Sequence, residues 1–201
     1  MSFLSIDSST DLGSLFVKIK NKTFSRVLQS DKFNNDLLMK QILDFFQEID
    51  LEFDDISHVF VNQGPGNFSG LRGSLAIAKG LSLAKNINLF GFNTFILSCA
   101  RFFEKKDFLY SLIKFRNKYF IKQFDKNLKS TSKVKEVNVN EIIKEYGNKF
   151  KVIPKHLIGQ FDEKILKLNN LSVVDLNYNE LELLQLKGLL DVNLIKPLYL
   201  S

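Results

Sequence analysis

A glycine-rich turn that leads into a helix constrains the fold of this chain more than any other feature. The stretch from Asn62 to Leu81, NQGPGNFSGLRGSLAIAKGL, holds five of the ten glycines among the 201 residues. The apolar run His58–Gln63 before it is typical of a buried strand, and the residues after the turn predict a helix over about 68–85. A strand, a tight turn and a helix in this order indicate an α/β protein.

The turn does not match the two standard phosphate-binding motifs. A P-loop requires G-x-x-x-x-G-K-[ST], but Gly64 and Gly70 are six residues apart and Leu71 stands in the lysine position. The dinucleotide pattern G-x-G-x-x-G fails by one residue. Two interpretations remain: backbone N–H groups that hold an anion, or glycines with unusual backbone angles beside a helix capped by Asn67 or Ser69. The residues of the anion or nucleotide interpretation are Asp7, Ser8, Gly64, Gly66, Asn67 and Arg72.

Two predicted helices have features that packing on a single sheet does not explain. Along the helix after the turn, small side chains recur at i, i+3/4, i+7 and i+11, and a mid-helix glycine costs about 1 kcal/mol relative to alanine. The sheet of the chain itself or a partner helix must therefore pack closely there. The helix expected over 36–49 is apolar around more than half its circumference, so it should be buried on two sides. The predicted interface comprises Leu38, Met39, Ile42, Leu43, Phe45, Phe46, Ile49, Gly73, Ala76, Ile77, Gly80 and Ala84.

The rest of the chain predicts a duplicated α/β unit. Three strands open the protein, with a hairpin around Asn21-Lys22, and paired strands around Arg116-Asn117 open the second half. In each half, helices then alternate with strands, including a short helix capped by Asn138. We expect residues 1–100 to form an N-terminal lobe with the glycine loop and the interface helices, and residues 101–201 to form a smaller, basic lobe.

Charge is distributed unevenly between the halves. Residues 1–100 carry 9 Lys/Arg against 10 Asp/Glu, whereas residues 101–201 carry 19 against 12. The segment 114–135 alone has eight basic residues and one acid, Asp125. Such a segment either contacts RNA phosphates or forms a solvated lysine-rich surface.

Few side chains suit catalysis or metal binding. The single cysteine, Cys99, cannot form an intramolecular disulfide and is expected to be a buried apolar residue in a reducing compartment. The histidines, His58 and His156, belong to no metal-binding motif, so no metal or cofactor is expected. Asp7, followed by three hydroxyl residues, can hold a metal-bound phosphate or cap a turn. Neither a signal peptide nor an apolar stretch of about 20 residues is visible, which predicts a cytoplasmic protein with no membrane contact.

Several motifs resemble the TsaB (YeaZ) family. Asp7-Ser8-Ser9-Thr10 follows a leading strand, where the family has I-D-T-S-T, and GPGNFSGLRGSLAIAKGL resembles the family's G-P-G-S-F-T-G-L-R-I-G-L-A-x-A-K-G-L. INLFGFNTF resembles I-P-L-V-G-V-S-T-L, and the ending KPLYLS resembles P-x-Y-L-R. Two family motifs differ: Asn34-Asn35-Asp36 replace H-S-E, and Lys114-Phe115-Arg116 keep only the arginine of D-A-R.

The resemblance implies an α/β fold of the actin-like (ASKHA) class, with two ribonuclease-H-like lobes and mixed sheets. It also implies a non-catalytic partner that pairs with and activates TsaD, the subunit that transfers the threonylcarbamoyl group to tRNA beside the anticodon. A TsaE-like ATPase is a further implied partner. Family members pair with TsaD through their first two helices, and isolated copies can form a homodimer through the same surface.

Three hypotheses follow. The first is a scaffold that activates a TsaD-like subunit in tRNA modification and has no turnover of its own. The second is an actin-like ATPase or phosphotransferase that uses Asp7 and the glycine loop. The third is an RNA-binding module that uses the basic segment 114–135.

Overall fold

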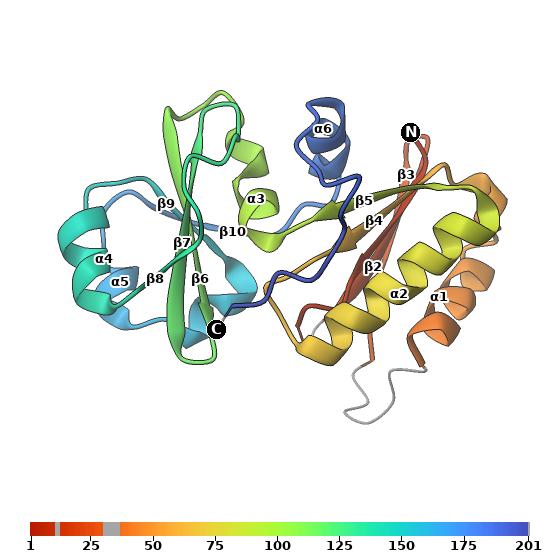
Figure 1. Cartoon of the computed structure of the whole chain (residues 1–201), viewed down its shortest axis with the longest axis horizontal. Coiled ribbons are helices and arrows are strands. Elements are labelled where there is room, and N and C mark those ends of the chain that lie inside the picture. Colours follow the sequence, from red (N-terminus) through yellow and green to blue (C-terminus); the bar gives the residue numbers. More distant parts are fainter. Residues whose placement is uncertain (11–12, 30–36, 201) are drawn as a thin grey trace. The chain divides into compact units, whose positions relative to one another are not determined.

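The chain forms two compact units, seen in a computed structural model that describes residues 1–10, 13–29 and 37–200 (Figure 1). The first lobe comprises residues 1–93 together with 190–200, and the second lobe comprises residues 94–189. The chain thus passes between the units seven residues before the predicted boundary at 100. Its C-terminal segment, which the sequence assigned to the second lobe, packs with the first. The predicted residues Asn34-Asn35-Asp36 lie outside the described ranges.

The first lobe is built on a mixed sheet of five strands in the order β3-β2-β1-β4-β5. The strands are β1 (Phe3–Asp7), β2 (Ser14–Ile19), β3 (Lys22–Val27), β4 (His58–Asn62) and β5 (Asn88–Phe92). β2 is antiparallel to both β1 and β3, while β4 and β5 run parallel to β1. Lys20 and Asn21 form the predicted hairpin turn, one residue earlier than expected, and Lys20 has a positive φ of 54°.

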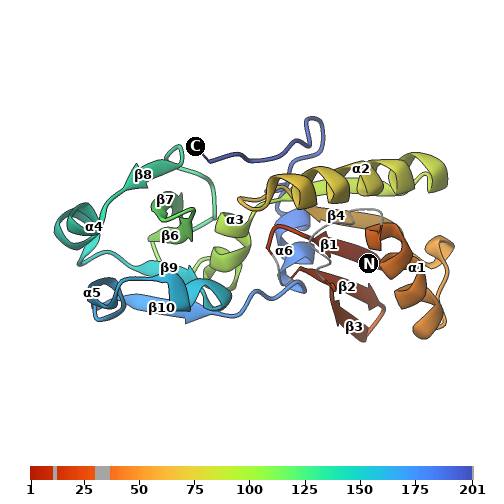
Figure 2. The ribbon, with the colours of Figure 1, turned by 90° about the horizontal axis from the view of Figure 1, so that it is seen from below.

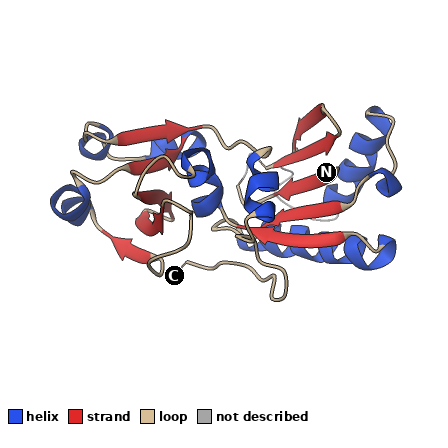
Figure 3. Ribbon diagram, turned by 90° about the horizontal axis from the view of Figure 1, so that it is seen from above, coloured by secondary structure: helices blue, strands red, loops and turns tan. Residues whose placement is uncertain are grey.

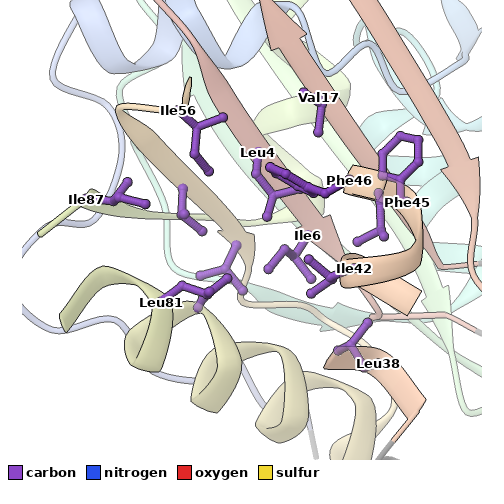
Figure 4. Packing of buried hydrophobic residues seen from close by; sticks show 14 of the residues in the cluster. Leu4, Ile6, Val17, Leu38, Ile42, Phe45, Phe46, Ile56, Leu81 and Ile87 are labelled. Carbon is purple, nitrogen blue, oxygen red and sulfur yellow. The ribbon is translucent and has the colours of Figure 1, made fainter. Parts of the chain in front are cut away.

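Two helices, α1 (Leu37–Glu48) and α2 (Phe68–Lys85), cover one face of this sheet side by side (Figure 2). Alternate side chains of the strands point toward them, so that Leu4 and Ile6 of β1 join one apolar core with Ile42 and Leu81 of the helices (Figure 4). The short turn η1 (Phe53–Asp55) adds Phe53, whose ring lies 4.5 Å from that of Phe46. The core therefore fixes where α1 and α2 lie on the lobe.

The second lobe repeats the strand scheme of the first. Its strands are β6 (Phe108–Phe115), β7 (Lys118–Asp125), β8 (Lys135–Val137), β9 (Lys151–Pro154) and β10 (Leu171–Val174), in the order β10-β9-β6-β7-β8. β7 is antiparallel to its two neighbours, and β9 and β10 continue parallel to β6. If the strands of each lobe are numbered 1 to 5 along the chain, both sheets have the spatial order 3-2-1-4-5, which confirms the predicted duplication.

Short helices lie before, between and after the strands of the second lobe (Figure 3). They are α3 (Thr94–Cys99), η2 (Ala100–Phe102), α4 (Val139–Tyr146), η3 (Lys155–Gln160), α5 (Glu163–Leu166) and α6 (Glu180–Leu186). Asn138 caps α4 as predicted, in a reciprocal capping box with Glu141. η3 and α5 were not predicted, because each is too short to show helical periodicity. Within the described parts of the chain, no helix combines the length and apolar character needed to cross a bilayer.

Candidate functional site

The glycine loop between β4 and α2 is braced against the end of β1. The buried carboxylate of Asp7 accepts hydrogen bonds from the Ser9 backbone N–H (3.0 Å), the Ser9 hydroxyl (2.7 Å) and the Asn62 amide (2.8 Å). Asn62 in turn accepts a bond of 2.8 Å from the backbone N–H of Gly64. Asp7, which from sequence could hold a metal-bound phosphate or cap a turn, therefore stabilises its own turn in the structure.

Two loop glycines are required by the closeness of the strand end. A Cβ at Gly66 would lie 2.1 Å from the backbone oxygen of Ser9, and one at Gly70 would lie 2.2 Å from that of Ser8. The Asn67 N–H donates to the Ser9 carbonyl at 2.8 Å, and the Ser8 hydroxyl donates to the Gly70 carbonyl at 2.8 Å. The space beside these glycines is thus filled by backbone of the chain itself.

The remaining loop features also have local explanations. Gly64 has a φ of 112°, a conformation that favours glycine. Asn67 caps α2, since its side chain accepts a bond of 3.2 Å from the Ser69 N–H, which confirms the capping interpretation for this residue. The fold brings Asp7, Ser8 and these loop residues together as the sequence indicated. An anion contact at the loop stays a prediction.

Arg72 lies apart from that brace, within a cluster that includes the C-terminal segment. Its guanidinium carbon is 5.0 Å from the ring centre of Phe68, and the Phe68 ring is stacked 5.2 Å from that of Tyr199. The segment is held by Gln63, whose carbonyl accepts from the Leu198 N–H at 2.6 Å and whose amide donates to the Lys196 carbonyl at 3.0 Å. The KPLYLS motif thus returns to the glycine loop.

The predicted interface residues of α1 divide into a buried and an exposed set. Leu38, Ile42, Phe45 and Phe46 are buried in the core of the first lobe. Met39 and Ile49 are half-buried against that core, whereas Leu43 is 48% exposed. The lobe's own sheet covers most of the apolar face of α1, and burial of its other side by a partner stays a prediction.

The predicted residues of α2 are mostly at the surface. Ala76, Gly80 and Ala84 are exposed, and Gly73 and Ile77 are half-buried. Outside the backbone of α2 itself, a Cβ at Gly73 or Gly80 would meet no atom of the described residues within 4 Å, so the sheet of the chain does not require either glycine. Leu83, which the sequence interpretation did not include, is 86% exposed beside them. The sequence feature that could have identified Leu83 as an interface residue is its position as a large apolar residue next to the stripe of small residues.

The other reactive groups are in structural environments. Cys99 is buried as predicted, and burial raises the pKa of its thiol to about 12. Burial also lowers the pKa of His58, whose ring stacks on those of Phe60 and Phe90. Among the described residues, no three His, Cys, Asp or Glu side chains gather as metal ligands.

The basic segment 114–135 is partly neutralised. Lys118 pairs with Glu136 at 2.9 Å, and Lys135 lies 3.6 Å from both Glu141 and Glu145. Lys114 donates to the Gln160 carbonyl at 2.6 Å. Two of the eight cations of the segment therefore have carboxylate partners, and contact of the segment with RNA stays a prediction.

Two lobes with mixed 3-2-1-4-5 sheets define an α/β protein of the actin-like class. Two solved structures share this fold over the whole chain: YeaZ from Pseudomonas aeruginosa (TM-score 0.74, 14% identity, 99% of each chain) and a protein from the same organism described as similar to peptidase YeaZ (0.74, 13%, 100% of this chain and 99% of that one). The structural likeness at this identity concerns the fold.

Sequence comparison shows which proteins the chain is similar to. Residues 30–113 match the sequence model of the TsaD family, described as tRNA N6-adenosine threonylcarbamoyltransferase. Proteins named tRNA threonylcarbamoyladenosine biosynthesis protein TsaB are similar: one from Buchnera aphidicola subsp. Schizaphis graminum is 29% identical over 102 residues, covering 51% of this chain and 49% of the relative. One from Buchnera aphidicola subsp. Baizongia pistaciae is 30% identical over 88 residues, covering 43% and 39%. The resemblance to the TsaB (YeaZ) family is confirmed, and the chain spans about half the length of the curated relatives it matches.

Proposed function

We propose that this chain is a non-catalytic subunit that pairs with a TsaD-like threonylcarbamoyltransferase and activates it in the synthesis of threonylcarbamoyladenosine on tRNA. The names of the relatives and the TsaD-type match support the pathway. The observation that carries the pairing is the outer face of α2, where two glycines face open space beside an exposed leucine.

The physical argument starts from the cost of those glycines. A glycine inside a helix lowers helix stability by about 1 kcal/mol relative to alanine, and no described residue of the lobe requires Gly73 or Gly80 to be small. Small side chains allow two helices to approach more closely than the usual interaxial distance of about 8–10 Å permits. A partner helix laid along Gly73, Ala76, Gly80 and Ala84, with Leu83 and Leu43 at its margins, would bury this exposed apolar surface.

We assign the chemistry to the partner. The carboxylate of Asp7, the residue on which an actin-like ATPase interpretation depends, is engaged by Ser9 and Asn62 within its own turn. In this proposal the subunit acts in the cytoplasm and supplies surface to the complex, which a TsaE-like ATPase joins. Two copies pair through the same face of α2 when the partner is absent.

The test is co-purification with the TsaD-like protein of the same organism. Gly80→Arg and Leu83→Asp are expected to abolish pairing with little effect on folding, because both positions are exposed. Gly159→Arg is the matched control, since Gly159 in the second lobe also faces open space. Phe46→Asp is unsuitable because Phe46 is buried and the variant would unfold the lobe.

Reconstituted tRNA modification by the TsaD-like subunit should require this chain and fail with Gly80→Arg. Pairing that survives both surface substitutions would contradict the proposed face. ATP turnover by the lone chain that is lost in Asp7→Ala would support the enzyme hypothesis instead.

A further inference from the structure

One end of the second-lobe sheet gathers cations and aromatic rings from segments far apart in the sequence. The turn after α3 is joined to the turn after β7 by a bond of 2.7 Å from the Glu104 N–H to the Lys126 carbonyl. Phe108 at the start of β6 pairs with Asp125 at the end of β7, and α6 contacts η2. We call this end of the lobe the basic–aromatic end. Its cations are Arg101, Lys105, Lys106, Lys126, Lys129 and Lys187.

These six cations have no carboxylate within ion-pair distance among the described residues. All six are exposed. Other lysines of the same lobe, such as Lys118 and Lys155, do have carboxylate partners. The acids of this end are Glu104, Asp107 and Asp125, and the Asp125 carboxylate accepts two backbone N–H groups at 2.9 Å. These six cations and three acids leave three positive charges, and α6, which Lys187 follows, carries two further acids, Glu180 and Glu182, in its first turn.

Aromatic rings alternate with the cations. The Lys106 ammonium lies 4.8 Å from the ring centre of Phe150, and the Lys187 ammonium lies 5.0 Å from that of Phe103. Phe102 contacts the Phe150 ring edge-on at 5.1 Å, and Arg101 lies over Phe102 at 5.8 Å. Phe108 is 51% exposed, so part of its ring is open to solvent.

We propose that the basic–aromatic end binds the phosphates and unpaired bases of a single-stranded RNA loop. Uncompensated cations attract a phosphate backbone, and exposed rings stack with bases that are free of a helix. RNA loops and bulges present such unpaired bases, whereas duplex RNA presents few. An acidic protein would pair with the cations but would leave the aromatic rings unused. This inference rests on the proposed function, in which the tRNA of the complex is the RNA that this lobe would contact.

Fluorescence anisotropy with the full chain tests the proposal. The probes are a labelled anticodon stem-loop of a tRNA that carries the modified adenosine and a fully paired RNA of the same length. We expect the stem-loop to bind at least fivefold more tightly than the duplex at low salt. Absence of binding, or equal affinity for the two RNAs, would overturn the proposal.

Two sets of variants locate the site. Lys106→Ala/Lys126→Ala/Lys129→Ala should weaken stem-loop binding at least tenfold. The triple variant should also reduce the slope of log affinity against log salt by about 2, since each phosphate that is no longer neutralised lowers the slope by about 0.7. The control, Lys144→Ala/Lys164→Ala/Lys167→Ala, removes the same charge from α4, from α5 and from the residue that caps α5, and should change affinity less than threefold. Equal losses in the two triple variants would show a general effect of lobe charge and would overturn the assigned site.

The stacking part of the proposal has its own readout. Phe108→Ala should lose about fivefold or more in affinity without changing the salt slope, and Phe108→Tyr should restore binding. Displacement of the RNA by poly-glutamate of equal charge at equal concentration would favour an acidic protein partner instead. The Lys106/Lys126/Lys129 variant should still pair with the TsaD-like subunit, and Gly80→Arg should still bind RNA, so either proposal can fail alone.

Discussion

The two lobes have the same strand order but hold the ends of their central strands differently. In the first lobe, β1 ends in the Asp7 turn, and a long glycine loop packs on it through Gly66 and Gly70. In the second lobe, β6 turns directly into β7 through Arg116 and Asn117, both with positive φ. Because the second lobe builds the same sheet without a glycine loop, the loop is not a requirement of the topology.

The surfaces of the lobes differ as much as their loops. The first 100 residues are nearly neutral and expose small and apolar side chains along α2. The remaining residues carry 19 basic against 12 acidic side chains, and six of the cations, at the basic–aromatic end, have no ion-pair partner among the described residues. One topology used twice therefore supports two kinds of surface, one suited to a protein helix and one to a polyanion.

The largest expected effect is in the glycine loop. Gly66→Ala places a methyl group 2.1 Å from the Ser9 carbonyl oxygen and 2.6 Å from its carbon, all backbone atoms. The loop at Gly66 and the backbone at Ser9 are held together by hydrogen bonds, so neither can move away freely. We therefore expect a loss of about 3 kcal/mol in the free energy of unfolding, measured by urea denaturation. Gly159→Ala, in open space of the second lobe, should stay within about 1 kcal/mol of wild type. An unchanged midpoint for Gly66→Ala would mean that the brace is not tight.

A somewhat smaller effect is expected where the second lobe buries a lysine. The Lys151 ammonium, fully buried at the start of β9, donates to the carbonyls of Tyr146, Gly147 and Lys149 at 2.7–2.8 Å and of Asn169 at 3.2 Å. Lys151→Met leaves these acceptors without their donor and should cost about 2 kcal/mol in the free energy of unfolding. Thermal denaturation of wild type and Lys151→Met measures this loss of stability, with Gly159→Ala as the control variant.

The same residue predicts a pH dependence. Burial lowers the pKa of Lys151 to about 8 from an ordinary value of 10.5, while its carbonyl acceptors offset part of the cost of charge. Between about pH 8 and 10.5, the folded state therefore binds fewer protons at this site than the unfolded state. Its contribution to the free energy of unfolding rises with pH across that window. Urea titrations at pH 7.5 and 9.5 should show this rise in wild type and a smaller one in Lys151→Met; identical pH dependence would contradict the lowered pKa.

Local signals explain which parts of the fold could be predicted from sequence. α2 was predicted at its observed ends, because Asn67 caps its start and Asn86, in the left-handed region, ends it. The β6–β7 hairpin and the Asn138 cap followed from equally local patterns. The return of the C-terminal segment to the first lobe was missed, although Gly91 and Asp191 exchange two backbone bonds there. A contact between residues 100 positions apart leaves no periodicity to detect.

The candidate site could be predicted only in part for a related reason. Hydrophobicity marks Phe45 and Leu43 alike, yet the first is buried in the core and the second is exposed. Which apolar residue of a helix faces its own sheet depends on how the helix is rotated, and α1 is fixed by long-range contacts such as that of Arg26 with Phe45. The basic–aromatic end likewise arises from four separated segments: residues 101–108, residues 125–129, Phe150 and Lys187.

The smallest expected effect has the opposite sign and contrasts the two groups of glycines within the first lobe. Gly80 is exposed inside α2, and a Cβ there would meet no atom within 4 Å. Gly80→Ala should therefore raise the free energy of unfolding by about 0.5–1 kcal/mol, because alanine loses less backbone entropy in a helix than glycine. If the glycine serves only close approach of a partner helix, the stabilised variant should pair less tightly with the TsaD-like subunit, whereas Gly159→Ala should pair as wild type does. A gain in stability with unchanged pairing would contradict the proposal that Gly80 allows a partner helix to approach closely. It would then favour a contact centred on Leu83.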